Sequence, residues 1–250
     1  CRNWSAGCYL KNLLSSLLRG IYKQKIEKAK KQLIKLPIEK AWVKLDFRSL
    51  GVYPKTTEYT LYLNPVDEGL SAQLYAWKLR EPLNTHFLFK VIADNKREID
   101  AVVDIGSNIG YFPLVEIASG SRRVIAIEPV PETYAILKKN LENFRNVSTL
   151  NVAVSDKKDI VRMLVPKMLN LATILGDTDY LKFAKTSVKS IINVQTLPIE
   201  NVLQMGGLKG LNVLIRMDIE GFEKSIIHKL PKEVYGVSFE LHSRILGYYV

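Results

Sequence analysis

The chain has 250 residues, 47% of them hydrophobic, which is enough for a buried core in one domain, or in one domain with an appendage. No run of about eighteen apolar residues occurs, so the sequence predicts no transmembrane helix. The two cysteines, Cys1 and Cys8, support neither a disulfide framework nor a zinc site, and we expect a cytoplasmic protein.

The net charge of +11 is concentrated in the first fifth of the chain. Residues 1–50 contain 12 Lys and Arg against 3 Asp and Glu, a balance of +9. The remaining 200 residues hold 24 against 22, a balance of only +2. A basic segment of this kind attracts nucleic acid or an anionic membrane surface.

Residues 9–36 are predicted to form one long helix, because leucines recur at helical spacing before a lysine-rich stretch that ends at Pro37. Its basic face is either solvated, on a helix that packs against the domain, or a contact surface for RNA or for a membrane. In the membrane case the protein would be peripheral at the membrane surface. We assign residues 1–36 to this basic amphipathic helix.

Residues 37–98 are predicted to form an appendage that caps the ligand site of the following domain, residues 99–250. Its strands are expected at residues 42–47 and 59–63, and a helical stretch over 67–95 is interrupted at Pro82.

Strands and helices alternate regularly from residue 99 onward. Strands are predicted at residues 101–105, 124–127, 147–154, 191–196, 211–217 and 237–241, and helices at 111–119 and 131–144. This alternation predicts an α/β fold with a mostly parallel sheet, helices on both faces and a ligand at the carboxyl ends of the strands.

A glycine turn follows the strand at 101–105, with Gly106 and Gly110 after Asp104. A dinucleotide fingerprint would need glycines where Asn108 and Tyr111 stand, so that class of cofactor is excluded. The spacing suits a cofactor without a pyrophosphate.

The next strand ends in Glu128, whose carboxylate is placed to bind both hydroxyls of a ribose. The glycine turn and this acid together predict a pocket for a ribose-bearing cofactor.

A second acidic block follows the strand at 211–217, where Asp218, Glu220 and Glu223 lie within six residues. Three carboxylates placed together are costly unless they bind a cation, a hydroxyl or a proton. The alternative is an acidic first turn that stabilises a helix dipole.

His242 ends the last predicted strand and is a candidate general base. We therefore predict catalytic roles for Asp218, Glu220 and His242. The same three side chains could ligate a hard divalent cation, but no ligand-spacing motif supports this, and no metal is predicted.

Six blocks in this order resemble the FkbM family of S-adenosylmethionine (SAM)-dependent methyltransferases. They are residues 104–111, 126–131, 137–143, 151–156, 217–223 and 239–242. The resemblance implies a Rossmann-like class I methyltransferase fold, SAM as the cofactor, and O-methylation of hydroxyls on small molecules or sugars.

The resemblance also implies roles for individual residues. The methionine end of SAM would be surrounded by Asp104, Gly106, Asn108 and Gly110. Glu128 would hold the ribose, and the turn containing Ala153, Ser155 and Asp156 would lie against the adenine. Asp218 would be nearest the methyl acceptor.

The sequence departs from the family pattern in two places. Arg216 lies two residues before Asp218, where the family usually has a lysine before its Asp-x-Glu-Gly block. The chain also stops eight residues after His242, so we expect the usual final helix and antiparallel strands to be missing, or another segment to cap that edge. Since the first residue is Cys and not Met, truncation at both ends is one of the two alternatives.

The leading functional hypothesis is a SAM-dependent O-methyltransferase acting on a small molecule or glycan. The alternative is an RNA methyltransferase that uses the basic segment at residues 1–36, although the acidic block has neither an Asn-Pro-Pro-Tyr motif nor a cysteine nucleophile. A third hypothesis is a non-enzymatic binding module with a membrane-surface arm, which the intact glycine turn and Asp218 disfavour.

Overall fold

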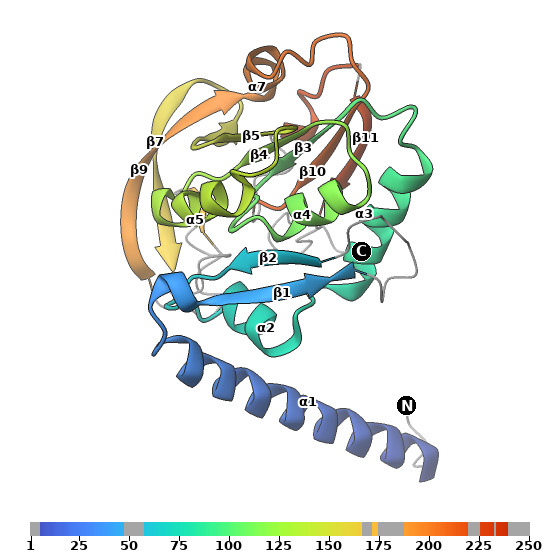
Figure 1. Ribbon diagram of the computed structural model, residues 1–250, viewed down its shortest axis with the longest axis vertical. Coiled ribbons are helices and arrows are strands. Elements are labelled where there is room, and N and C mark those ends of the chain that lie inside the picture. Colours follow the sequence, from blue (N-terminus) through green and yellow to red (C-terminus); the bar gives the residue numbers. More distant parts are fainter. Residues whose placement is uncertain are drawn as a thin grey trace.

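A computed structural model describes residues 6–47, 58–166, 172–174, 188–219, 226–232 and 234–239 of the chain. At its centre is a five-stranded sheet in the order β11-β10-β3-β4-β5, in which every neighbouring pair is parallel (Figure 1). The strands are β3 (Ala101–Ile105), β4 (Val124–Ile127), β5 (Val147–Leu150), β10 (Val213–Met217) and β11 (Val234–Phe239). The predicted α/β class with a parallel, Rossmann-like sheet is confirmed.

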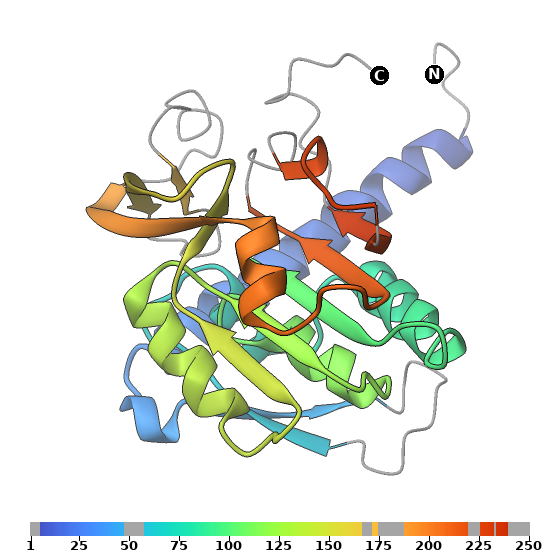
Figure 2. The same cartoon turned by 90° about the horizontal axis from the view of Figure 1, so that it is seen from above.

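Helices cover both faces of this sheet, so every residue of β3, β4 and β10 is buried. Val102 and Leu214 pack in one hydrophobic cluster with α3 (Pro82–Asp94), α4 (Tyr111–Ala118) and α5 (Pro131–Leu141). Val103 and Ile215, which point the other way, pack in a second cluster with α7 (Ile199–Met205). Figures 1 and 2 show α7 on the side of the sheet opposite α4 and α5.

The order of the strands reverses next to β3. The chain continues from β3 to β4 and β5 on one side, and later adds β10 and β11 on the other side. A crevice opens at the carboxyl ends of the strands where such a sheet reverses its order. The glycine turn after β3 and Asp218 after β10 therefore face one another across the expected ligand site.

The N-terminal part contains a long helix, a hairpin and a short helix. Its elements are α1 (Ala6–Leu33), the 3-10 turn η1 (Ile38–Lys40), β1 (Trp42–Asp46), β2 (Glu58–Tyr62) and α2 (Leu70–Trp77). The C-terminal half of α1 packs on α2, where the rings of Tyr22 and Trp77 stack at 5.8 Å and Leu33 is fully buried. The predicted long helix, the two strands and the interruption at Pro82 are confirmed.

The N-terminal part and the parallel sheet share one hydrophobic cluster, which extends from Leu33 and Leu61 to Leu214. Asn140 on α5 fastens the two parts together. Its side chain accepts a bond from the Tyr62 N–H at 2.7 Å and donates to the carbonyls of Tyr62 at 2.9 Å and Ile109 at 2.7 Å. The hairpin is thus tied directly to the glycine turn.

The stretch predicted as one strand at residues 147–154 is two strands in different sheets. Asn151 turns the chain after β5 by donating to the carbonyls of Glu128 at 2.8 Å and Pro129 at 3.1 Å. The chain then enters a four-stranded sheet of order β6-β9-β7-β8. Its strands are β6 (Ala153–Ser155), β7 (Asp159–Pro166), β8 (Thr173–Ile174) and β9 (Val188–Pro198).

The strand predicted at 191–196 is therefore β9 of this smaller sheet, where it pairs antiparallel with β7. Neither β7 nor α7 was predicted. In the described part of the chain, no helix is both long and apolar enough to cross a membrane.

Candidate active site

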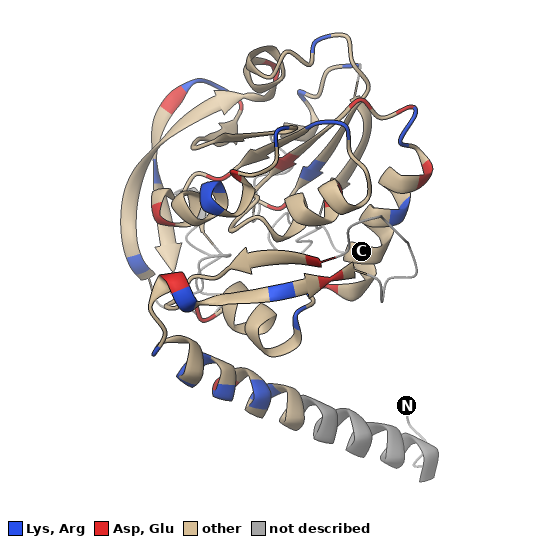
Figure 3. Cartoon of the chain, viewed as in Figure 1, with Lys and Arg blue, Asp and Glu red and all other residues tan. Residues whose placement is uncertain are grey.

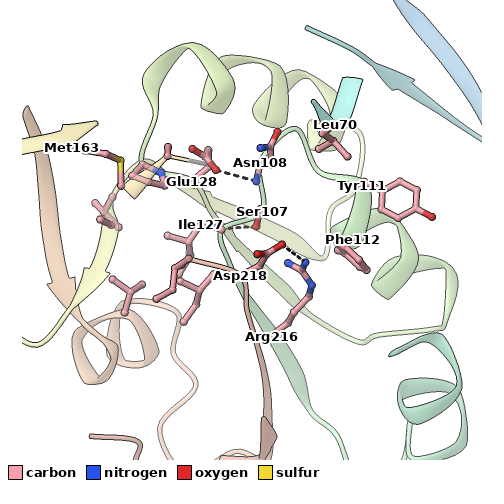
Figure 4. Close-up of a pocket in the computed structure, with 18 of the residues that line it drawn as sticks. Leu70, Ser107, Asn108, Tyr111, Phe112, Ile127, Glu128, Met163, Arg216 and Asp218 are labelled. Carbon is pink, nitrogen blue, oxygen red and sulfur yellow. Dashed lines mark hydrogen bonds and ion pairs between the residues drawn. The ribbon is translucent and has the colours of Figure 1, made fainter. Parts of the chain in front are cut away.

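A hollow of about 790 Å³, measured out to its open mouth, lies at the carboxyl ends of β3, β4 and β10. Figure 4 shows Met163 at one end of the hollow and Leu70, Tyr111 and Phe112 at the other. Glu128 and Asn108 lie between these ends, above Asp218 and Arg216 in this view.

The glycine turn shapes this hollow through a backbone that only glycine adopts without strain. Gly106 has φ +85°, and a Cβ there would collide with the backbone carbonyl of Asp218. The turn and the end of β10 are therefore packed backbone to backbone, and the Asp218 N–H donates to the Ile105 carbonyl at 2.9 Å. Gly110 has φ +96°, and a Cβ there would lie 3.0 Å from Leu137.

The side chain of Ser107 connects the glycine turn to both β3 and β4. Its hydroxyl donates to the carbonyl of Asp104 at 2.9 Å and accepts the N–H of Ile127 at 3.0 Å. The tips of β3 and β4 are thereby held in fixed positions.

Glu128, at the end of β4, is only 6% exposed. Its two oxygens accept the N–H groups of Asn108 at 3.0 Å and Val130 at 2.9 Å. Burial raises the pKa of Glu128 to about 7, although these two bonds oppose the rise. Each carboxylate oxygen can accept a further hydrogen bond, so Glu128 suits a ligand that presents two hydroxyls.

A buried ion-pair cluster lies beneath the hollow. Asp104 and Arg216 are directly opposite one another on β3 and β10, and Arg216 Nη1 donates to Asp104 Oδ1 at 2.7 Å. Arg216 Nη2 donates to Asp218 Oδ2 at 3.0 Å, and the guanidinium lies over the ring of Phe112 at 3.7 Å. Arg216 thus fixes the position of Asp218 at the base of the hollow.

The cluster contains more carboxyl groups than positively charged groups. Glu116 on α4 is fully buried. Among the described residues, neither of its carboxyl oxygens has a hydrogen-bond partner, and neither does Asp104 Oδ2. Burial, and then the neighbouring Asp104, raises the pKa of Glu116 well above its usual value, and burial also raises the pKa of Asp104. The single guanidinium of Arg216 pairs with both Asp104 and Asp218, so it balances these two carboxylates only in part.

The end of the hollow that lies across from Leu70, Tyr111 and Phe112 is apolar. The side chains that line it come from β4, β6, β7 and the connections beside them, and they are Ile127, Val152, Val154, Met163 and Ala172. A wall of this kind suits a flat, weakly polar ring such as a nucleobase.

The structure places the predicted cofactor residues in two groups. The hollow is lined by Gly106, Asn108, Glu128 and Ala153, and by the predicted catalytic residue Asp218. The residues that lie outside its lining are Asp104, Gly110, Ser155 and Asp156. The predicted catalytic residues Glu220 and His242 lie outside the described residues.

Sequence reasoning expected a cap from residues 37–98 but assigned no role to Arg80. This residue, in the connection between α2 and α3, lines the hollow. The pairing of Arg216 with Asp104 was also missed, although their positions at the ends of two strands could have indicated it. In the described part of the chain, no group of three or more His, Cys, Asp and Glu side chains is arranged to hold a metal ion.

Comparison with known proteins matches the chain to a family, to a curated relative and to solved structures. The family described as "Methyltransferase FkbM domain" matches residues 104–245. The hexuronic acid methyltransferase AglP of Haloferax volcanii is 21% identical over 179 residues, which cover 68% of this chain and 67% of the relative. The crystal structure of a candidate RNA methyltransferase from Pyrococcus horikoshii matches 28% of this chain and 37% of its own, at 19% identity and a TM-score of 0.26.

Proposed function

Since the chain belongs to the FkbM methyltransferase family, we propose that it is a SAM-dependent enzyme that methylates a hydroxyl group on a small molecule or glycan. The main support for the proposal is the position of Glu128, a buried carboxylate at the end of β4 that lines the hollow. Its two oxygens accept hydrogen bonds from two backbone N–H groups.

The residues of the hollow fit SAM. Glu128 would accept hydrogen bonds from the two ribose hydroxyls, and Val154 and Met163 would pack against the adenine. Asp104 and Asp218 give two carboxylates against the one guanidinium of Arg216, and this excess of negative charge favours a cationic ligand in the hollow. When bound, SAM supplies a methyl group on a positively charged sulfur.

The protein's contribution to the reaction would be to bind and orient the reactants. Asp218 lines the hollow, and Arg216 fixes its carboxylate. Its carboxylate would accept the hydrogen bond of an acceptor hydroxyl and direct the oxygen toward the cofactor. The relative AglP is named as a hexuronic acid methyltransferase, which supports a sugar as the acceptor. Glu220 and His242 stay predicted catalytic residues.

Transfer of label from methyl-labelled SAM tests this proposal. Incubation with fractionated cell extract should place label in glycans or small molecules, and Glu128→Gln should reduce the rate at least about tenfold by removing a charged hydrogen-bond acceptor. Glu132→Gln is the matched control, because Glu132 is exposed and pairs only with Lys189 in the described structure. Absence of label from every fraction, or equal rates for both variants, would contradict the proposal.

A second candidate function, RNA methylation, is favoured by the outward face of α1. Lys23, Lys28 and Lys31 on α1 and Lys35 just after it are exposed, and none forms an ion pair with a described residue. Figure 3 shows Lys and Arg recurring along the C-terminal half of α1. RNA binding that weakens steeply with salt and disappears when residues 1–36 are deleted would support this candidate. Binding to vesicles with anionic lipids, without RNA binding, would assign the same lysines to a peripheral membrane contact instead.

A further inference from the structure

A second, smaller hollow adjoins the first on the side of α3. It shares Phe112, Arg216 and Asp218 with the cofactor hollow. Its other walls come from α3, from the residue before it, and from the strands β10 and β11, and they include Glu81, Asn84, Leu88 and Ser238. Because Asp218 lines both hollows, it is placed to contact a ligand in each of them.

The corner that supplies Glu81 is held in a strained conformation. Lys78 and Glu81 have φ +57° and +41°, a region that costs a non-glycine residue about 1 kcal/mol or more. The corner is fixed by the start of α4, because the Arg80 N–H donates to the Tyr111 hydroxyl at 3.2 Å. Thr85 Oγ1 also donates to the Arg80 carbonyl at 2.6 Å. Arg80 then lines the cofactor hollow while its neighbour Glu81 lines the second one.

The carboxylate of Glu81 is oriented by two donors. Arg80 Nη2 lies 2.7 Å from Glu81 Oε1, and Asn84 Nδ2 donates to Glu81 Oε2 at 3.1 Å. The side chain of Glu81 is 26% exposed, so it remains accessible to a ligand. It is thus a pre-positioned hydrogen-bond acceptor at the wall of the second hollow.

The charges around the second hollow disfavour an anion. Its lining contains the carboxylates of Glu81 and Asp218. Arg80 pairs with Glu81, and Arg216 pairs with both Asp218 and the buried Asp104, so three carboxylates face two guanidinium groups. A carboxylate or phosphate in this space would face like charges, whereas a hydroxyl could donate to either acid. Leu88 and Phe112 offer an apolar surface for the C–H groups of a ring.

We propose that this second hollow binds the methyl acceptor, that the acceptor is a neutral, hydroxyl-rich ring such as an uncharged sugar, and that Glu81 and Asn84 select it. The inference rests on the proposed function and deepens it. The N-terminal part of the chain thereby supplies specificity residues as well as a share of the core.

Saturation-transfer NMR on the full chain with S-adenosylhomocysteine tests the inference. The probes are the methyl glycosides of glucose, galactose and mannose, each paired with the methyl glycoside of its uronic acid. At least one neutral glycoside should bind about tenfold more tightly than its uronic acid partner, because the acids repel the carboxylate. Glu81→Gln should weaken that neutral glycoside about tenfold and reduce the discrimination, and Asn84→Leu should also weaken it.

Glu98→Gln is the control, because Glu98 is an exposed acid just beyond α3 and should leave sugar binding unchanged. Calorimetry with S-adenosylhomocysteine separates the two proposals, since Glu81→Gln should retain the wild-type affinity for it. No binding of S-adenosylhomocysteine to the wild type would overturn the proposed function instead. Tighter binding of the uronic acids, binding of no sugar at all, or unchanged sugar binding in both variants would overturn the inference.

Discussion

Glu128 and Arg216 differ in their charge near neutral pH, and therefore in their roles in the site. Glu128 carries a pKa raised to about 7 by burial, so part of its population is protonated near neutral pH. Arg216 stays charged, because Asp104 and Asp218 raise its pKa although burial alone would lower it. One residue therefore makes ligand binding depend on pH, and the other holds the acids of the site together.

The affinity for SAM should rise with pH through the pKa of Glu128. The ionised carboxylate accepts both ribose hydroxyls, and with a pKa of about 7 its ionised fraction increases about tenfold between pH 6 and pH 8. The dissociation constant should fall by about the same factor in calorimetric titrations. Glu128→Gln should bind more weakly and show no such trend, whereas an equal pH dependence in this variant would assign the titration to another group.

Arg216→Met should destabilise the protein by about 3–5 kcal/mol. The substitution leaves Asp104, which is fully buried, without its ion-pair partner. Urea unfolding measures the loss, with Arg122→Met as the control. Arg122 pairs with Asp100 at a half-exposed position, so its loss should cost no more than about 1 kcal/mol. Similar losses of unfolding free energy in the two variants would show that the buried ion pair stabilises the protein no more than the exposed one.

At the scale of single elements, the parallel strands were the most predictable part. The strands at 101–105 and 124–127 were predicted with their observed bounds, because runs buried on both faces are continuously apolar. The split after Leu150 was not predictable from periodicity, since it depends on Asn151 bonding to carbonyls more than twenty residues away. Strand β7 was missed because its buried residues, from Met163 to Pro166, occupy only one end.

Two glycine-to-alanine substitutions should have opposite effects on stability. Gly106→Ala places a side chain at φ +85° and against the Asp218 carbonyl, so it should destabilise the protein by more than about 2 kcal/mol and weaken SAM binding. Gly20→Ala lies inside α1 with open space around the new Cβ, and should stabilise by up to about 1 kcal/mol. Thermal unfolding of both variants measures this, and the same sign in both would contradict the assigned roles.

At the scale of the whole molecule, the site is built from parts that are distant in sequence. The glycine turn, Glu128 and Asp218 could be predicted because each follows a strand of the parallel sheet. Arg80 and Glu81 could not, since they reach the site only through packing of α3 against α4 and through the hydroxyl of Tyr111. The shared hydrophobic cluster explains why this packing is fixed.

Calorimetric titration of the purified protein with SAM tests whether the hollow beside Glu128 binds this cofactor. We expect one site in the wild type, unchanged affinity in Glu132→Ala, and loss of measurable binding in Glu128→Ala. Circular dichroism of each variant confirms that the fold is kept. No heat of binding with the wild type, or equal affinities in the two variants, would contradict binding of SAM in this hollow.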